Sequence, residues 1–563
     1  MRRLEQLLHD TDHKSYPAYK ALAGSFQFPG FSLSIDHVQG DPFAAPSSLS
    51  IHMNAVQHGM PKEYYESTHR RIMLQDYLLR GVYRALGSFS HRAKGSGKSG
   101  TLSVSCPRQE VLERSALCIG EKDGSLILRF SAGFPAAGRT TLSMELKKML
   151  MEYVPSCVKQ CLVYSALRKE ELKKWIALAD YQKALRQQLA EKSLVAFVAD
   201  GAILPRASGV DDRPMKDALP FASPEEDRVS LTLPDGRSIS GLGIKKGITL
   251  IVGGGYHGKS TLLKALERGV YDHIPGDGRE YVLTESSAMK LRSEDGRAVK
   301  QLDISAFIRD LPNGRDTKCF STEDASGSTS QAANTVEAVL SGSRTLLIDE
   351  DTSATNFMVR DALMQSVIHP GEEPIIPFLG RMRQLYEEKG ISTVLVAGSS
   401  GAFFQVSDCI LQMKEYRPID ITAAAKKAAE NEPAATDAGP LPEWKDARIP
   451  LPNREITEAR KLKVRGSGTD SVSVGHESVE LRFVEQVVDP EQTNLLASML
   501  RVLEEKHFNG RTSLAECVNA LYAAWQKQGF AAVTAGRIPG NLAAVRLQEL
   551  WAMVNRYRAL RLA

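Results

Sequence analysis

Residues 253–260 read GGGYHGKS and follow the pattern G-x-x-x-x-G-K-[ST], the spacing of a phosphate-binding loop. The apolar run ITLIV before them predicts a buried strand, and STLLKALERG after the lysine predicts a helix. Glycines let the backbone wrap around phosphate oxygens, and amides at a helix start attract anionic charge. The three features together predict a nucleoside triphosphate site, with ATP and Mg²⁺ as the expected ligands.

The motif also predicts the roles of the side chains in the loop. Lys259 is expected to reach the β- and γ-phosphates, and the Ser260 hydroxyl is expected to hold Mg²⁺. The residues expected to contact the nucleotide are Gly253, Gly254, Gly255, Tyr256, His257, Gly258, Lys259, Ser260 and Thr261. A second GKS, at 97–99, has Arg92 where the first glycine is needed and leads into a strand, so we interpret it as a basic flexible loop.

An apolar strand that ends in two acids follows later, as TLLIDE at 345–350. Asp349 is expected to hold Mg²⁺ through its coordination shell. Glu350 points to the other side of the strand and is the candidate catalytic residue, because a carboxylate there can polarise a water against the γ-phosphate. Between the loop and the acids, ASGSTSQ at 325–331 opens a predicted helix. Its small residues fit an ordinary N-terminal cap, and they fit a second anion site.

These segments, in this order, resemble the ABC ATPases and, more narrowly, the soluble family described as predicted ATPases of the ABC class. The resemblance rests on GGGYHGKSTLLKALERG, ASGSTSQAANTVEA, LLIDEDTSATNFMVRD, VQGDPFAAPSS and FVADGAILPRASG, and it covers nearly the whole chain. It implies an ABC core flanked by family-specific domains. It also implies a head-to-tail homodimer, in which ATP on one subunit is capped by Ser326, Gly327 and Ser328 of the other. A link to RNA is implied as well, since a relative belongs to a mitochondrial mRNA-editing assembly.

The chain departs from the ABC pattern at several positions. The signature reads ASGST rather than LSGGQ, and SATN at 353–356 replaces SALD. Gly398 and Ser399 stand where a switch histidine is expected, and His257 is one conceivable substitute. Gln301 is the candidate for the loop glutamine that contacts Mg²⁺ and the attacking water, with 303–305 or a nearby acid as the alternative. The missing histidine predicts slow hydrolysis.

The 563 residues suggest three or four structural units at roughly 100–200 residues each. We predict an α/β fold: a P-loop NTPase of ABC type at 226–420, a mixed α/β N-terminal domain at 1–225, a linker at 421–475 and a small helical C-terminal domain at 476–563. The chain shows no apolar stretch of the ~18 residues that a membrane span needs, and its first residues are charged. The seven scattered cysteines read as reduced thiols, so a cytoplasmic protein without a membrane partner is expected.

Basic residues cluster locally although the net charge is only +4. Such clusters track a phosphate backbone in some proteins and form a solvated face in most. The N-terminal cluster contains Arg70, Arg71, Arg80, Arg84, His91, Arg92, Lys94 and Lys98, with Tyr64, Tyr65 and Tyr77 for stacking, and Lys169, Lys173, Lys174, Lys183 and Arg186 follow. The tail adds Arg537, Arg546, Arg556, Arg558 and Arg561 with Trp551 and Tyr557, and we interpret it as a helical docking or dimer module, with an RNA-facing rim as the alternative. RNA is the expected partner, and an ATP-dependent switch that acts on proteins is the alternative.

Overall fold

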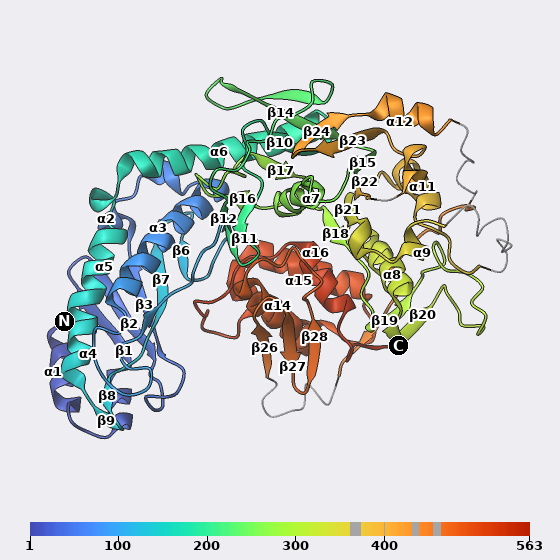
Figure 1. Cartoon of the computed structure of the whole chain (residues 1–563). Helices are drawn as coiled ribbons and strands as arrows, with labels where there is room; N and C mark the ends of the chain where they lie inside the picture. The colour runs from blue at the N-terminus through green and yellow to red at the C-terminus, as the bar shows by residue number, and fades with distance from the viewer. Residues whose placement is uncertain (361–372, 399, 431–437, 454–462) are drawn as a thin grey trace. The chain divides into compact units, whose positions relative to one another are not determined.

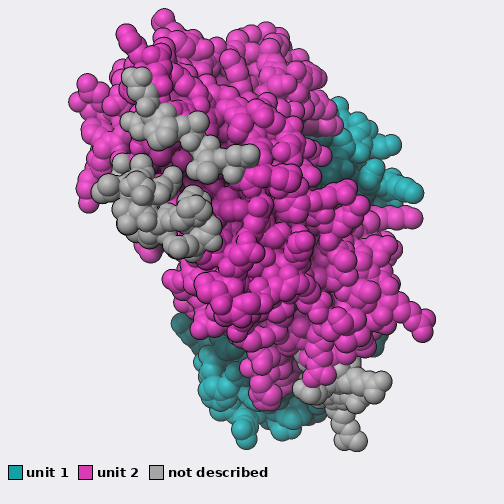
Figure 2. All heavy atoms as spheres, turned by 90° about the vertical axis from the view of Figure 1, so that its right-hand side faces the viewer, with its two compact units in different colours: residues 1–181, 535–544 teal, residues 182–534, 545–563 magenta. Residues whose placement is uncertain are grey.

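The computed structural model describes the chain except residues 361–372, 399, 431–437 and 454–462. The described residues divide into two units, coloured separately in Figure 2. Unit 1 comprises residues 1–181 and 535–544, and unit 2 comprises residues 182–534 and 545–563. Each unit is described by itself. Among the described residues, none of the helices combines the length and the apolarity that a membrane span requires.

Unit 1 contains an antiparallel sheet in the order β1-β2-β3-β7-β4, with β6 also paired to β7 (Figure 1). Buried and partly exposed residues alternate along β7, as expected for a sheet with one covered face. The sheet strands are β1 (Gly24–Phe28), β2 (Phe31–His37), β3 (Ser47–Met53), β4 (Leu102–Ser103), β6 (Leu117–Ile119) and β7 (Leu126–Ala132). The main helices are α1 (Arg2–Thr11), α3 (Thr68–Phe89), α4 (Ser143–Lys148), α5 (Val154–Cys161) and the first part of α6 (Lys169–Glu191).

Unit 2 contains a six-stranded sheet in the order β18-β21-β22-β15-β23-β24. Its first five strands pair in parallel and the last pair is antiparallel. These strands are β15 (Ile248–Val252), β18 (Met289–Leu291), β21 (Thr345–Asp349), β22 (Ser392–Val396), β23 (Cys409–Lys414) and β24 (Arg417–Asp420). The helices α7 (Lys259–Arg268), α8 (Gly327–Leu340) and α11 (Leu379–Lys389) connect them (Figure 1). This α/β arrangement is the one that the sequence predicts.

A second, antiparallel sheet of unit 2 runs in the order β13-β14-β10-β17. Its strands are β10 (Leu194–Ala199), β13 (Arg228–Thr232), β14 (Ser238–Lys245) and β17 (Val282–Thr284), and a separate hairpin joins β19 (Arg297–Leu302) to β20 (Phe320–Ala325). Strand β10 precedes residue 226, where the sequence predicts the core to begin, and it pairs with β14 and β17, which follow that residue. The antiparallel sheet of unit 2 therefore contains strands from before and from after residue 226.

The C-terminal part of unit 2 combines three helices with a small sheet. The helices are α14 (Pro490–Val502), α15 (Leu514–Gln528) and α16 (Leu547–Asn555), and the sheet contains β26 (Val464–Ser467), β27 (Ser471–Val474) and β28 (Glu477–Glu480). Asp489 and Gln492 form a capping box at the start of α14, and Pro490 occupies its first turn, so this helix start follows from local sequence. The stretch expected as a linker, 421–475, contains α12 (Thr422–Ala428), β25 (Pro450–Leu451), β26 and β27 among its described residues.

Candidate nucleotide site

The loop at 253–260 joins β15 to α7 at the carboxyl edge of the parallel sheet. Gly253 has φ +141°, and a Cβ atom there would lie 2.5 Å from the carbonyl oxygen of Met413. Gly258 caps the helix with φ +94°. Only glycine adopts these backbone angles without strain, so the glycine spacing of the motif follows from the loop's conformation and its approach to β23.

Lys259 lies over its own loop. Its ammonium group donates to the carbonyl oxygens of Gly253 at 2.6 Å and Gly254 at 2.9 Å. Ser260 is exposed in the first turn of α7, and a Cβ on Gly255 would meet no atom within 4 Å. A cation, an exposed hydroxyl and accessible loop backbone around a helix start fit the phosphates of a nucleotide. Thr261 follows in the same turn and is half-buried.

Asp349 and Glu350 lie at the same sheet edge as the loop. Strand β22 lies between β15, which leads into the loop, and β21, which ends in Asp349. Its Val396 pairs with Ile251 of β15 on one side and with Asp349 on the other. Two strand spacings put Asp349 about 10 Å from the end of β15, which is a span that a triphosphate and its metal can bridge. Asp349 is only 8% exposed, and burial raises its pKa, while Lys290 opposes that rise.

The side chain of Glu350 accepts a hydrogen bond from the backbone N–H of Gly398, at 2.6 Å. Gly398 follows β22 and stands where the ABC resemblance implies a switch histidine. The bond therefore joins the predicted catalytic carboxylate to the segment that replaces this histidine. Ser399, the other residue expected there, lies outside the described residues.

The signature-like segment forms the start of α8, with Ser326 at the N-cap and Gly327 as the first helical residue. Ser326 is exposed, whereas the Ser328 hydroxyl is buried and donates to Asn356 at 2.5 Å. Gln331 contacts the same region, since its amide nitrogen donates to Ser353 at 2.8 Å. The start of α8 is thus hydrogen-bonded to the SATN segment of its own chain. Of the three residues predicted to cap the ATP of a second subunit, Ser326 is the most accessible.

His257 and Gln301 occupy different surroundings. The Nδ1 atom of His257 accepts from the backbone N–H of Glu415 at 3.0 Å, in the turn between β23 and β24, and Tyr256 beside it is fully exposed. Gln301 lies in the β19–β20 hairpin, where its amide nitrogen donates to the carbonyl oxygen of Ala563 at 3.2 Å. In Figure 1 that hairpin lies away from β15 and α7, so the structure does not bring Gln301 to the loop.

Sequence reasoning missed the strand that lies next to Asp349. It is β18, whose Leu291 pairs with Ile348, and the residues directly after it begin with Arg292. Residues 292–296, which follow β18, read RSEDG and contain no glutamine, so no motif in the sequence indicates this segment. The signal was weak, since β18 has only three residues and a lysine at its centre.

Several of the cations that suggested RNA contact form ion pairs within their own unit. Within unit 1, Arg70 binds Asp180 with two nitrogens at 2.8 Å, and Arg80 pairs with Asp76. The tyrosines Tyr64, Tyr65 and Tyr77 are buried and present no ring for stacking. In unit 2, Arg186 pairs with Asp272, Arg546 with Glu549, and Arg556 with Glu294, while Trp551 and Tyr557 are each 1% exposed. Arg546, Arg556, Trp551 and Tyr557 of the tail are thus engaged within unit 2, which does not support the alternative of an RNA-facing rim there.

Comparisons with known proteins agree with this architecture. The model described as ATPase of the ABC class N-terminal matches residues 1–165, the ABC_ATPase model, described as a P-loop domain, matches 168–445, and the model described as MRB1590 C-terminal domain matches 463–563. The chain belongs to the family of ABC-class ATPases. Its P-loop domain and family-specific N- and C-terminal domains confirm the resemblance that the sequence motifs indicated.

One curated relative is an uncharacterized protein of Methanocaldococcus jannaschii, 37% identical over 193 residues. The match covers 32% of this chain and 42% of that protein, so the chain spans about two fifths of the relative's length. Similar solved structures include cbiO1 of Clostridium perfringens, part of the ABC transporter complex cbiONQ, at 15% identity and a TM-score of 0.25 over 43% of this chain and 92% of that one. An ATP-binding cassette of an ABC transporter in its ADP conformation has 12% identity and a TM-score of 0.23, over 36% and 93%.

Proposed function

We propose that the chain binds ATP with Mg²⁺ at the 253–260 loop and hydrolyses it, with Glu350 as the general base. The observation that carries this proposal is the bond from Gly398 N–H to Glu350, because it orients one carboxylate at the sheet edge that also holds Lys259. Lys259 and the loop amides would hold the phosphates, and Ser260 with Asp349 would hold Mg²⁺, which offsets phosphate charge when bound. Glu350 would take a proton from the water that attacks the γ-phosphate.

The test compares Glu350→Gln with Asp351→Asn, a matched removal of charge from the next, exposed residue. Glutamine cannot accept the proton, so steady-state turnover should fall about 100-fold or more, while ATP affinity stays within a few-fold of wild type. Asp351→Asn should leave turnover within a few-fold of wild type. Equal turnover in wild type and Glu350→Gln would refute the role of Glu350. A wild-type chain that does not bind ATP would refute the whole proposal.

The proposal includes a head-to-tail dimer that closes on ATP. The support is the accessibility of Ser326 at the start of α8, together with exposed loop residues that a second subunit could cover. Light scattering of Glu350→Gln should show a monomer without nucleotide and a dimer with ATP and Mg²⁺. Adding Ser326→Arg should abolish the ATP-dependent dimer without changing ATP binding by the monomer. A dimer that persists in this double variant would contradict the predicted interface.

RNA remains the partner class that the exposed cations of unit 1 favour. His91, Arg92, Lys94 and Lys98 are exposed on one loop, and none forms an ion pair with another described residue of unit 1. The backbone N–H of Lys98 donates to the carbonyl oxygen of Pro42 at 2.8 Å, and the next residue, Phe43, is 63% exposed. Exposed cations beside an exposed aromatic ring suit a single-stranded backbone and a stacked base.

A triple variant, Arg92→Gln, Lys94→Gln and Lys98→Gln, tests this surface by the salt dependence of RNA binding. The slope of log affinity against log salt should decrease by about two, since roughly 0.7 ions are released per phosphate contact on a single strand. The control is Lys20→Gln, Lys62→Gln and Lys122→Gln, three exposed lysines of unit 1 outside the basic clusters, which should leave the slope unchanged. Wild type that binds no RNA at physiological salt would favour the alternative, a switch that acts on protein partners.

A further inference from the structure

Segment 483–488 of the C-terminal part leads from β28 to α14 and packs against the ATPase core within unit 2. Val484, Val487 and Val488 are buried in it. Their burial fixes the backbone between them, so the two polar residues of this segment, Glu485 and Gln486, are held toward α7 and β18. Helix α7 begins at the phosphate loop, and β18 pairs with the strand that ends in Asp349.

The Glu485 carboxylate joins these two elements by charge. One oxygen lies 3.1 Å from the ammonium nitrogen of Lys264 on α7, and the other lies 3.1 Å from a guanidinium nitrogen of Arg292, directly after β18. Burial alone would raise the pKa of Glu485, but Lys264, Lys290 and Arg292 outweigh that effect and lower its pKa to about 2. The carboxylate is therefore charged at neutral pH and attracts both elements.

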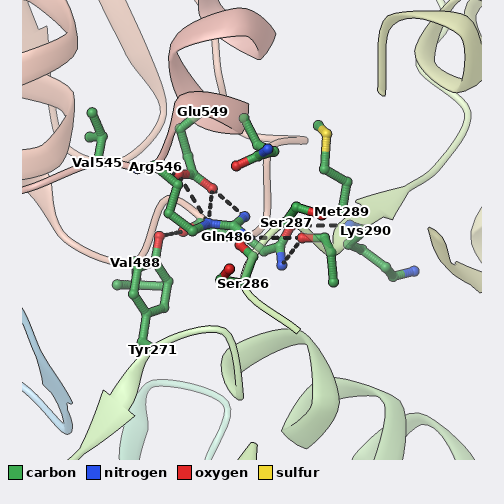
Figure 3. A network of polar contacts seen from close by, with 12 residues as sticks. Tyr271, Ser286, Ser287, Met289, Lys290, Gln486, Val488, Val545, Arg546 and Glu549 are labelled. Carbon is green, nitrogen blue, oxygen red and sulfur yellow. Dashed lines mark hydrogen bonds and ion pairs between the residues drawn. The ribbon is translucent and has the colours of Figure 1, made fainter. Parts of the chain in front are cut away.

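Gln486 joins the same two elements through one side-chain amide, and Figure 3 shows it beside Lys290. Its nitrogen donates to the carbonyl oxygens of Glu267, in the last turn of α7, at 3.2 Å and of Ala288 at 3.1 Å. Its oxygen accepts from the backbone N–H of Lys290, at 3.1 Å. The residue is 3% exposed, so water cannot replace these bonds easily, and losing them would leave buried polar groups unpaired.

Lys290 connects this group of residues to the segment that follows β21. Its side chain is buried and its ammonium nitrogen lies 3.4 Å from the hydroxyl oxygen of Thr352, two residues after Glu350. Burial lowers the pKa of Lys290, whereas Glu485, Glu267 and Asp349 oppose that fall. Lys290 thus interacts electrostatically with both Glu485 and Asp349, the predicted Mg²⁺ ligand.

We propose that Glu485 and Gln486 are positioning residues for the nucleotide site, and that the C-terminal part senses nucleotide through them. The inference rests on the proposed function. If α7 moves when phosphate binds, or β18 moves when Mg²⁺ binds, segment 483–488 is displaced as well, because Glu485 and Gln486 contact both elements directly. By linkage, any partner that moves this segment must change the affinity of the site for nucleotide.

The first test substitutes Glu485→Gln, with Glu485→Asp as the conservative variant and Glu480→Gln as the matched control. Glu480 is an exposed carboxylate of the same part of the chain and pairs only with the exposed Arg482 among described residues. Glu485→Gln should lower kcat about 10-fold and change KM less than threefold, because the reacting groups shift while the loop still binds phosphates. Glu485→Asp should recover at least half of the loss, and Glu480→Gln should match wild type.

The second test uses hydrogen exchange on the unmodified chain and so does not depend on how variants fold. ATP with Mg²⁺ should slow amide exchange at 484–488 at least threefold and leave 471–480 in the adjacent sheet unchanged. Unchanged exchange at 484–488 in a chain that binds ATP would overturn the sensing role. Normal kcat in a folded Glu485→Gln chain would overturn the positioning role. A wild-type chain that neither binds nor hydrolyses ATP would instead refute the proposed function, so the two failures are distinguishable.

Discussion

Arg556 offers a direct measure of how firmly α16 is joined to the ATPase core of unit 2. It directly follows this helix and binds Glu294, which lies beyond β18. Both side chains are nearly buried, at 10% and 4% exposure. Removing one partner of a buried ion pair costs about 3–5 kcal/mol because the other charge stays desolvated. Asn334 donates to Glu294 at 3.0 Å, and Arg297 lies close enough to lower the pKa of Glu294. Glu294 therefore keeps favourable interactions when Arg556 is removed, and the cost of Arg556→Ala should lie near the lower end of this range, at about 3 kcal/mol.

Urea unfolding of unit 2, followed by the fluorescence of its tryptophans, measures this cost. Arg511→Ala is the control, since Arg511 is an exposed arginine of the same part of the chain, and it should cost less than about 0.5 kcal/mol. The pair Arg556→Met with Glu294→Gln should be more stable than Arg556→Ala alone, because no unpaired charge remains. A cost below 1 kcal/mol for Arg556→Ala, or additive costs in the pair, would refute the view that a buried ion pair joins the two parts.

Two further predictions concern the loop and a carboxylate pair. Lys259→Met should weaken ATP binding about 100-fold, measured by calorimetry, since two charge-assisted bonds to phosphate oxygens are lost; unchanged affinity would show that the loop does not hold the phosphates. Asp227 has its pKa raised to about 6, first by burial and then by the neighbouring carboxylate of Asp420. A raised carboxyl pKa means that stability is greatest below the unfolded value near 4 and decreases as pH rises toward 6. Asp227→Asn should therefore raise Tm at pH 7.5, by about 2 °C after allowance for its partial exposure, and leave Tm unchanged at pH 4; an increase at both pH values would contradict this account.

The parts of the site that the sequence predicted are local in the chain. The glycines, Lys259 and the flanking strand and helix lie within about 20 residues, and each has a backbone reason that a motif captures. The placement of Gln301 depended on knowing which strand lies beside β21, and pairing between distant segments cannot be read from spacing. The position of Gln301 in the β19–β20 hairpin follows from such pairing, with Ala563 as its partner.

The charged clusters show a second limit of sequence reasoning. Arg70 and Arg556 belong to basic stretches in the sequence, yet their partners Asp180 and Glu294 lie 110 and 262 residues away. The sequence shows that basic residues are close together along the chain, but it does not show which acidic residues lie beside them in the fold. A basic cluster is therefore easily interpreted as an exposed surface. The loop that contains Lys94 and Lys98 differs because its backbone is hydrogen-bonded to Pro42, Gly133 and Ala136, while its cationic side chains lie at the surface.

The bond between Gly398 and Glu350 allows a final, closely controlled prediction about catalysis. Gly398 has no atom within 4 Å of an added Cβ and does not adopt a left-handed φ, so Gly398→Ala should keep both the N–H donor and the activity. Gly398→Pro removes this donor and with it the constraint on the carboxylate. Turnover should fall about 10-fold in the proline variant while ATP affinity changes little, because the loop and Lys259 are untouched. Stopped-flow hydrolysis and equilibrium ATP binding, measured on both variants, separate the two effects. If proline and alanine variants hydrolyse ATP equally fast, the N–H group does not orient the general base. The missing switch histidine would then have no replacement in the backbone that follows β22.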